Sequence, residues 1–431
     1  MIQRFLIPLL FCGICTGTGQ AAQSNADLYR YTVHLDVSNV NARNRETDGN
    51  PSAPFRTLEK ALDWAHDLWN SEEGDVRLII HPGKYQGAIR IRNAHRSPRL
   101  VIEAEKPGTV WISGAEPVGP WTSVEAGLWT APWSNRASIE IISNQGPAGA
   151  VFRAGSEVVT AGTQWVSQSL TSSNLAEGTY FVESSVGEKP GKILLRMPVA
   201  WSIQSGVQAG ARPEESLDPS RNAVRIENTG HIVLRGLGFE MLRGRHPAIS
   251  IRKAYDIVLE NCAIRRVARE GISMTACDGI FMRGLRIEEA GWCALNVRDC
   301  RNVRMEDFGF FRNLGREAPE SMRRNILIFN SSNVALRWGR LTGNGGAALR
   351  LEGKNKELKF TQLFFSDHER GLEVGAGSGT PFFTNCVFEG DRAPGFLANG
   401  VAPVFTGFTN AEDADAQTMK SQLDKRWNGN F

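Results

Sequence analysis

The chain has 431 residues, of which 41% are hydrophobic and 22% are charged, and its formal net charge is +3. This composition is typical of a folded globular protein and excludes a largely disordered chain. A net charge so close to zero also gives no global attraction to nucleic acid, so we expect no nucleic-acid partner.

Residues 1–22 have the pattern of a secretory signal. Arg4 precedes a short apolar stretch, and small or polar residues follow it. The stretch is too short to span a membrane, and the rest of the chain contains no longer candidate. Neither Cys12 nor Cys15 follows a small residue, so plain cleavage is favoured over a lipid-modified cysteine. The sequence therefore predicts a secreted or periplasmic protein without a membrane span.

Residues 23–118 are predicted to form an N-terminal cap and the first coils of a solenoid. Apolar residues recur at helical spacing between Thr57 and Trp69, which predicts a capping helix. Alternating apolar residues predict strands at Val76–Ile80 and at Ala88–Ile91.

Residues 119–215 interrupt this pattern and are interpreted as a lateral β-rich insertion. Several short strand-like runs occur there, together with five tryptophans, namely Trp121, Trp129, Trp133, Trp165 and Trp201. Aromatic side chains in a small β-domain usually fill its core, and we expect this more than a role as sugar-stacking platforms.

Residues 216–410 contain a repeat that decides the fold class. Short triplets with two inward apolar residues and one outward residue recur 23 to 31 residues apart, beginning at Val224, Ile249, Ile272, Leu295, Ile326, Leu349 and Leu372. Each triplet is followed by a turn rich in Asn, Asp or Gly, and two further alternating strands complete each coil. Three short strands per coil, with no helix between them, predict an all-β, right-handed parallel β-helix solenoid.

Residues 411–431 carry apolar side chains at Met419, Leu423 and Trp427. This spacing predicts a short C-terminal helix that caps the last coil, with an unstructured tail as the alternative.

Five cysteines remain after cleavage of the signal. Cys277 and Cys300 occupy equivalent places in adjacent coils, where the strand spacing of about 4.8 Å would suit a disulfide. Cys262 and Cys386 fall on inward positions and are interpreted as buried thiols. The sequence shows no zinc-binding pattern, so we expect no cofactor; a calcium ion remains open, without a clear site.

The chain resembles the pectate-lyase-like superfamily of right-handed β-helix proteins, many of which are secreted bacterial polysaccharide lyases or glycoside hydrolases. The resemblance rests on segments that include Asp48-Gly49-Asn50, Pro54 to Leu58, His81 to Tyr85, Val110 to Glu116 and Leu175 to Val182. It implies the scaffold but does not imply one reaction. The aspartate clusters of calcium-dependent pectate lyases and of polygalacturonases do not occur at the outward positions of the first strands, which puts both of those mechanisms in doubt.

The outward positions of the first strands, and the loops just ahead of them, supply the candidate site residues. The candidate catalytic residues are His246 as a base, Arg269 and Arg298 as neutralisers of a uronate carboxylate, and Glu270 as a possible acid. The candidate substrate-binding residues are Arg252, Trp292, Asn296, Arg350, Glu352 and Glu373, with Trp292 as a stacking surface. Leu327 and Phe329 also point outward, so we expect residues from about Arg312 to Arg323 to fold over them as a rim.

These residues predict a monomeric polysaccharide lyase that cleaves an anionic glycan by β-elimination. A glycoside hydrolase is the first alternative, with Glu352 and Glu373 as the carboxyl pair. The second alternative is a non-catalytic glycan-binding or surface-structural solenoid. The arginines could also lie on a solvated face with local ion partners and have no role in binding.

Overall fold

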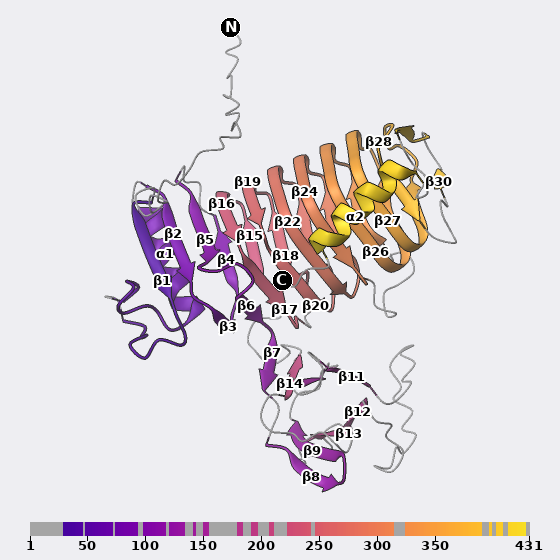
Figure 1. Cartoon of the computed structure of the whole chain (residues 1–431). Helices are drawn as coiled ribbons and strands as arrows, with labels where there is room; N and C mark the ends of the chain where they lie inside the picture. The colour runs from indigo at the N-terminus through magenta and orange to yellow at the C-terminus, as the bar shows by residue number, and fades with distance from the viewer. Residues whose placement is uncertain are drawn as a thin grey trace, which may run out of the picture.

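The computed structural model is a parallel β-solenoid with a lateral β-domain and two helices (Figure 1). It describes residues 29–45, 48–71, 74–93, 98–117, 120–133, 141–143, 150–154, 179–183, 191–196, 207–210, 222–242, 246–313, 324–389, 396–398, 402–407 and 413–427. The predicted signal, residues 1–22, therefore lies outside the described residues. Neither helix of the described part has the length and hydropathy needed to cross a membrane.

Each coil contributes one strand to each of three parallel sheets. Sheet 1 consists of β4 (Ile89–Arg92), β15 (Val224–Glu227), β18 (Ile249–Arg252), β21 (Ile272–Thr275), β23 (Leu295–Arg298), β25 (Arg324–Phe329), the last parts of β26 (Ser332–Glu352) and β27 (Lys356–Val374), and β30 (Phe396–Ala398). This is the face on which the sequence placed the candidate site.

Sheets 2 and 3 close the coil. Sheet 2 consists of β1 (Tyr31–Leu35), β2 (Val76–Ile80), β5 (Leu100–Ala104), β16 (Gly230–Arg235), β19 (Tyr255–Glu260), the first parts of β22 (Asp278–Ala290), β24 (Arg301–Phe311), β26 and β27, then β28 (Phe382–Thr384) and β31 (Val404–Thr406). Sheet 3 consists of β3 (Gly83–Tyr85), β6 (Val110–Ser113), β17 (Leu237–Glu240), β20 (Ala263–Val267), the later part of β22, the end of β24, the middle parts of β26 and β27, and β29 (Val387–Glu389).

The turns between sheets recur at the same place in every coil. The residue after most described sheet 1 strands has a positive φ, for example Asn228, Lys253 and Asp299. A left-handed residue bends the chain sharply without a long loop, which favours Asn, Asp or Gly there. This repetition keeps successive coils in register, so inward and outward residues form continuous columns.

The interior is a continuous apolar core along the solenoid. Columns such as Ile249, Ile272 and Leu295 are fully buried, and phenylalanines fill the later coils. Because one coil cannot bury its own inner face, stability depends on stacking and on covered ends.

The first helix, α1 (Leu58–Ser71), covers the N-terminal end, as the sequence predicts. It buries Leu58, Ala61, Leu62, Ala65 and Trp69 and packs against β1, β2, β4 and β5. The indole of Trp69 donates a hydrogen bond to the carbonyl of Pro98, at 2.8 Å.

The second helix, α2 (Ala414–Trp427), is confirmed as a helix but does not simply cap the last coil. It crosses the outer face of sheet 3 (Figure 1). Met419, Leu423 and Trp427 pack there with Phe364 and Val387. The helix therefore joins several coils along the side of the solenoid.

The lateral domain forms a separate sheet in the order β7, β14, β10, β11, β12, β13, β9, β8. Its strands are β7 (Ala115–Pro117), β8 (Thr122–Glu125), β9 (Leu128–Trp133), β10 (Ile141–Ser143), β11 (Ala150–Ala154), β12 (Thr179–Glu183), β13 (Gly191–Arg196) and β14 (Val207–Gly210). Leu128 and Leu194 form a small buried cluster. Trp121 and Trp129 are partly exposed, whereas the side chains of Trp133, Trp165 and Trp201 lie outside the described residues.

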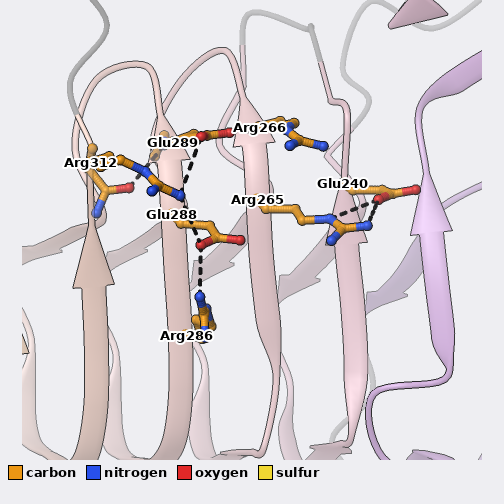
Figure 2. Close-up of polar contacts among 9 residues, drawn as sticks. Glu240, Arg265, Arg266, Arg286, Glu288, Glu289 and Arg312 are labelled. Atoms are coloured by element: carbon orange, nitrogen blue, oxygen red, sulfur yellow. Dashed lines mark hydrogen bonds and ion pairs between the residues drawn. The ribbon is translucent and has the colours of Figure 1, made fainter. Parts of the chain in front are cut away.

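Ion pairs cover much of the outer face of sheet 3 (Figure 2). Arg265 pairs with the buried Glu240, at 2.6 Å, and also lies over the indole of Trp111. Arg312, the first residue of the expected rim over sheet 1, contacts Glu288 and Glu289 here, at 3.7 and 3.6 Å. The prediction was therefore wrong for Arg312, because these carboxylates hold its side chain over another face; residues 314–323 lie outside the described residues.

The expected disulfide is not formed: all five described cysteines are free and buried. The side chains of Cys277 and Cys300 influence each other across adjacent coils: Cys300 lowers the pKa of Cys277, and Cys277 raises the pKa of Cys300. Each also lies close to a main-chain carbonyl, Cys277 Sγ at 3.3 Å from Thr275 O and Cys300 Sγ at 3.0 Å from Arg298 O. These carbonyls satisfy the thiols in the reduced state. Cys262 and Cys386 are buried thiols, as predicted.

Candidate functional site

The outer face of sheet 1 presents three columns of side chains. The parallel register places Arg252, Thr275 and Arg298 in one column. The middle column contains Ser250, Ser273, Asn296, Leu327, Arg350 and Glu373, and the third column, two residues before each triplet, contains Glu270, Cys293, Arg324 and Arg370. The stacking that the sequence predicts is therefore confirmed.

The structure divides the predicted catalytic residues into two groups. His246, Arg269 and Trp292 lie three residues ahead of their triplets, whereas Arg298 lies at the far end of its strand. Six chain positions separate these two levels of a coil, so the base His246 and the neutraliser Arg298 lie towards opposite edges of sheet 1. The sequence indicated that both belong to this face but could not indicate this separation.

Arg269 and Trp292 form a pair at the first edge. The guanidinium carbon of Arg269 lies 3.2 Å from the centre of the Trp292 ring, and the Trp292 amide donates a hydrogen bond to the Arg269 carbonyl. The guanidinium covers one face of the indole, so this face is not open for a sugar to stack on. His246 is exposed nearby in sequence but has no hydrogen bond or ion pair to either residue among the described contacts.

Arg298 is held at the opposite edge by two neighbours. Its Nε donates a hydrogen bond to Asn296 Oδ1, at 3.1 Å, and its guanidinium lies 5.5 Å from the ring centre of Phe329. No salt bridge to Arg298 is found within the described parts of the chain. Asn296 thus orients the guanidinium and leaves its two terminal nitrogens for a ligand.

Arg324 is a candidate functional residue that the sequence did not single out. It is the first residue of β25 and is only 5% exposed. Burial lowers the pKa of Arg324; Cys293 and Glu352 oppose this effect, while the charges of Arg350 and Arg298 reinforce it. Alternation extended back from the inward Ile326 would place Arg324 on the inner face, so the repeat carries no signal for this residue.

Cys293 lies between the charged groups of this face. Burial raises the pKa of the Cys293 thiol, Glu270 acts in the same direction, and Arg324 and Arg298 act against it. The charges of Glu270, Arg298 and Arg324 therefore all act on this buried thiol.

Arg350 lies between two carboxylates. Its Nη2 is 2.5 Å from Glu352 Oε1, its Nε is 3.4 Å from Glu373 Oε2, and Arg370 also pairs with Glu373, at 2.6 Å. The three predicted binding residues of this group are thus brought together. Leu327 and Phe329 separate this group from Arg298. Leu327 is fully buried, and Phe329 is half-buried.

The described residues contain no group of three or more His, Cys, Asp or Glu side chains arranged to hold a metal ion. The charged groups on sheet 1 are mainly guanidinium and carboxylate pairs, and guanidinium is not a ligand for calcium.

The comparisons with known proteins agree with this architecture. A family model described as a right-handed beta helix region matches residues 222–403. The chain is a right-handed parallel β-helix protein. A comparison with curated protein sequences finds no match.

Several solved structures are similar to this β-helix protein. The complex of XylC with xylose has a TM-score of 0.57 and 13% sequence identity, over 83% of this chain and 65% of XylC. A glycoside hydrolase has a TM-score of 0.48 and 12% identity, over 90% of this chain and 98% of the other. An alginate lyase from Paenibacillus sp. str. FPU-7 has a TM-score of 0.33 and 9% identity, over 81% of this chain and 97% of the lyase. The β-helix protein spans about two thirds of the length of XylC, and at 13% identity the likeness to XylC shows the fold alone.

Proposed function

We propose that this β-helix protein binds an acidic polysaccharide along sheet 1 and cleaves it by β-elimination. The observation that carries the proposal is the arginine cluster of Arg298, Arg324 and Arg350. Three successive strands, β23, β25 and β26, carry these guanidinium groups, and the charges of Arg298 and Arg350 both act against the charge of Arg324. A bound carboxylate would relieve this repulsion, and arginine can bind it through two parallel hydrogen bonds.

The extended face also fits a polymer better than a small molecule. Its columns continue over many coils at a spacing of about 4.8 Å, so one chain of sugars can contact successive strands. The xylose reported with XylC supports a carbohydrate ligand for this fold, although it gives no support for an acidic one.

In the proposed reaction, Arg298 and Arg324 neutralise the uronate carboxylate. The ring proton beside the carboxylate then becomes more acidic, and Glu270 removes it. The electron pair of the broken C–H bond forms a ring double bond, and the glycosidic C–O bond breaks on the other side. The departing oxygen takes up a proton from solvent water, and a new unsaturated chain end results. Glu270 replaces His246 as the preferred base because it shares the electrostatic neighbourhood of Arg298 and Arg324.

A second candidate function is glycoside hydrolysis at Glu352 and Glu373. Both carboxylates contact the guanidinium of Arg350, so they lie within the separation of about 5–10 Å that hydrolases use. Their ion pairs argue against this role, since one carboxyl group must donate a proton to the leaving oxygen and an arginine favours the charged form.

The test is an assay of purified protein on alginate, pectate, chondroitin and neutral plant glycans. β-Elimination raises both the ultraviolet absorbance of unsaturated ends and the number of reducing ends. Hydrolysis raises reducing ends alone, and a binding protein raises neither but retards in a gel that contains its glycan. Absence of the absorbance change on every acidic glycan would overturn the lyase proposal.

A further inference from the structure

One column of sheet 1 carries arginines on alternate strands. The parallel register aligns Arg92, Glu227, Arg252, Thr275 and Arg298 on five successive strands, β4, β15, β18, β21 and β23. Positive charge therefore occurs on the first, third and fifth strands. The second strand carries a carboxylate and the fourth carries a neutral hydroxyl.

The arginines of this column extend into solvent. Arg92 and Arg252 are exposed, and within the described residues neither forms a salt bridge, not even with Glu227 on the strand between them. Glu227 instead pairs with Arg225 of its own strand, at 2.7 Å. The two guanidinium groups are thus available for an external anion.

The spacing of these charges defines a period. Two strand spacings amount to about 10 Å, and one sugar ring with its glycosidic oxygen extends a chain by roughly one strand spacing. A carboxylate on every second sugar would therefore meet Arg92, Arg252 and Arg298 in turn. A carboxylate on the sugar between the first two would lie at the level of Glu227, where this column has no guanidinium and Arg225 already pairs with Glu227.

We propose that the ligand is an acidic glycan in which uronate sugars alternate with neutral sugars, and that Arg92 and Arg252 select it. This inference rests on the proposed function and narrows its substrate class. Arg92 and Arg252 lie away from the arginine cluster, so they bind and position the chain, whereas Arg298 contacts the reacting uronate.

The experiment compares the affinities of the purified protein for two classes of glycan. In hyaluronan and unsulfated chondroitin, uronate sugars alternate with neutral sugars. In polygalacturonate and polyguluronate, every sugar carries a carboxylate. We expect at least tenfold tighter binding of the alternating glycans at equal ionic strength. The variants Arg92→Gln and Arg252→Gln should each weaken that binding about tenfold and make it less sensitive to salt, because each removes one ionic contact.

Arg283→Gln provides the matched control, because Arg283 is also an exposed arginine on a strand but lies on sheet 2. It should bind like the unmodified protein. Equal or tighter binding of the uniform polyuronates, or unchanged binding by both sheet 1 variants, would overturn the inference while leaving the proposed function standing. Failure of every acidic glycan to bind would overturn both.

Discussion

Arg265 donates two hydrogen bonds to one carboxylate oxygen of Glu240, from Nε at 2.9 Å and from Nη2 at 2.6 Å. Burial alone would raise the pKa of Glu240, but the hydrogen bonds and charges of Arg265 and Lys84 lower it overall. The pair links β17 to β20 on the outer face of sheet 3, where the ion pairs of Figure 2 follow one another from coil to coil.

We expect Arg265→Leu to lower the free energy of unfolding by about 3–5 kcal/mol, because it leaves the buried carboxylate with Lys84 alone. Arg304→Leu is the matched control, since the pair of Arg304 with Glu306 is largely exposed and should contribute less than about 1 kcal/mol. Denaturant titration of both variants measures the difference. Equal losses would show that the burial of Glu240 does not increase the contribution of its ion pair to the free energy of unfolding.

Trp427 fixes the end of α2 against the solenoid. Its side chain is buried beside Phe311, and its carbonyl accepts a hydrogen bond from Arg286, at 3.2 Å. Trp427→Ala should lower the free energy of unfolding by about 3–5 kcal/mol and make α2 accessible to protease. Lys425→Ala, at an exposed position of the same helix, should change neither quantity. A variant Trp427→Ala with unchanged stability would contradict the docking of α2 on sheet 3.

The free energy of unfolding should decrease when the pH is lowered, because of His368. Burial lowers its pKa from 6.5 to about 4, so between these two values the unfolded chain binds a proton that the folded chain does not. The free energy of unfolding should therefore decrease as the pH falls from about 6.5 to about 4, by at most roughly 3 kcal/mol from this residue. Burial also lowers the pKa of His34, which adds to the same trend. His368→Gln should show a smaller decrease than the unmodified protein, and identical pH profiles would argue against the burial of His368.

The five described cysteines should resist thiol reagents in the folded state. All are buried, and burial raises the pKa of Cys262 and of Cys386 to about 12, which leaves little reactive thiolate at neutral pH. Mass spectrometry after brief alkylation should find these five sites unmodified until denaturant is added. Rapid modification of Cys262 in the folded protein would contradict its inward position.

The repeat predicted the solenoid because alternation of side chains fixes which residues share a face. The inward residues Ile249, Ile272 and Leu295 stack in the core, and Arg252 and Arg298 stack outside, as expected. Alternation does not determine the direction in which a long side chain extends, or the position of residues that lie in turns. For this reason the sequence grouped His246 with Arg298 and did not single out Arg324.

The same limit applies to the C-terminal helix. The spacing of Met419, Leu423 and Trp427 predicted one apolar face but carried no information about its partner. The partner surface arises from Phe364 and Val387, which come together only after β27 and β29 stack in sheet 3. Contacts of this kind depend on the assembled solenoid and have no signal in a single coil.

The rate at which Arg298→Lys forms unsaturated ends from an acidic glycan tests the central claim most directly. Lysine keeps the positive charge but cannot donate one hydrogen bond to Asn296 and two parallel ones to a carboxylate. We therefore expect the rate to fall about a hundredfold while the unfolding midpoint stays unchanged. Arg301→Gln, at a highly exposed position on sheet 2, should retain the full rate. Product formation by Arg298→Lys at the rate of the unmodified protein would contradict the assignment of sheet 1 as the site of cleavage.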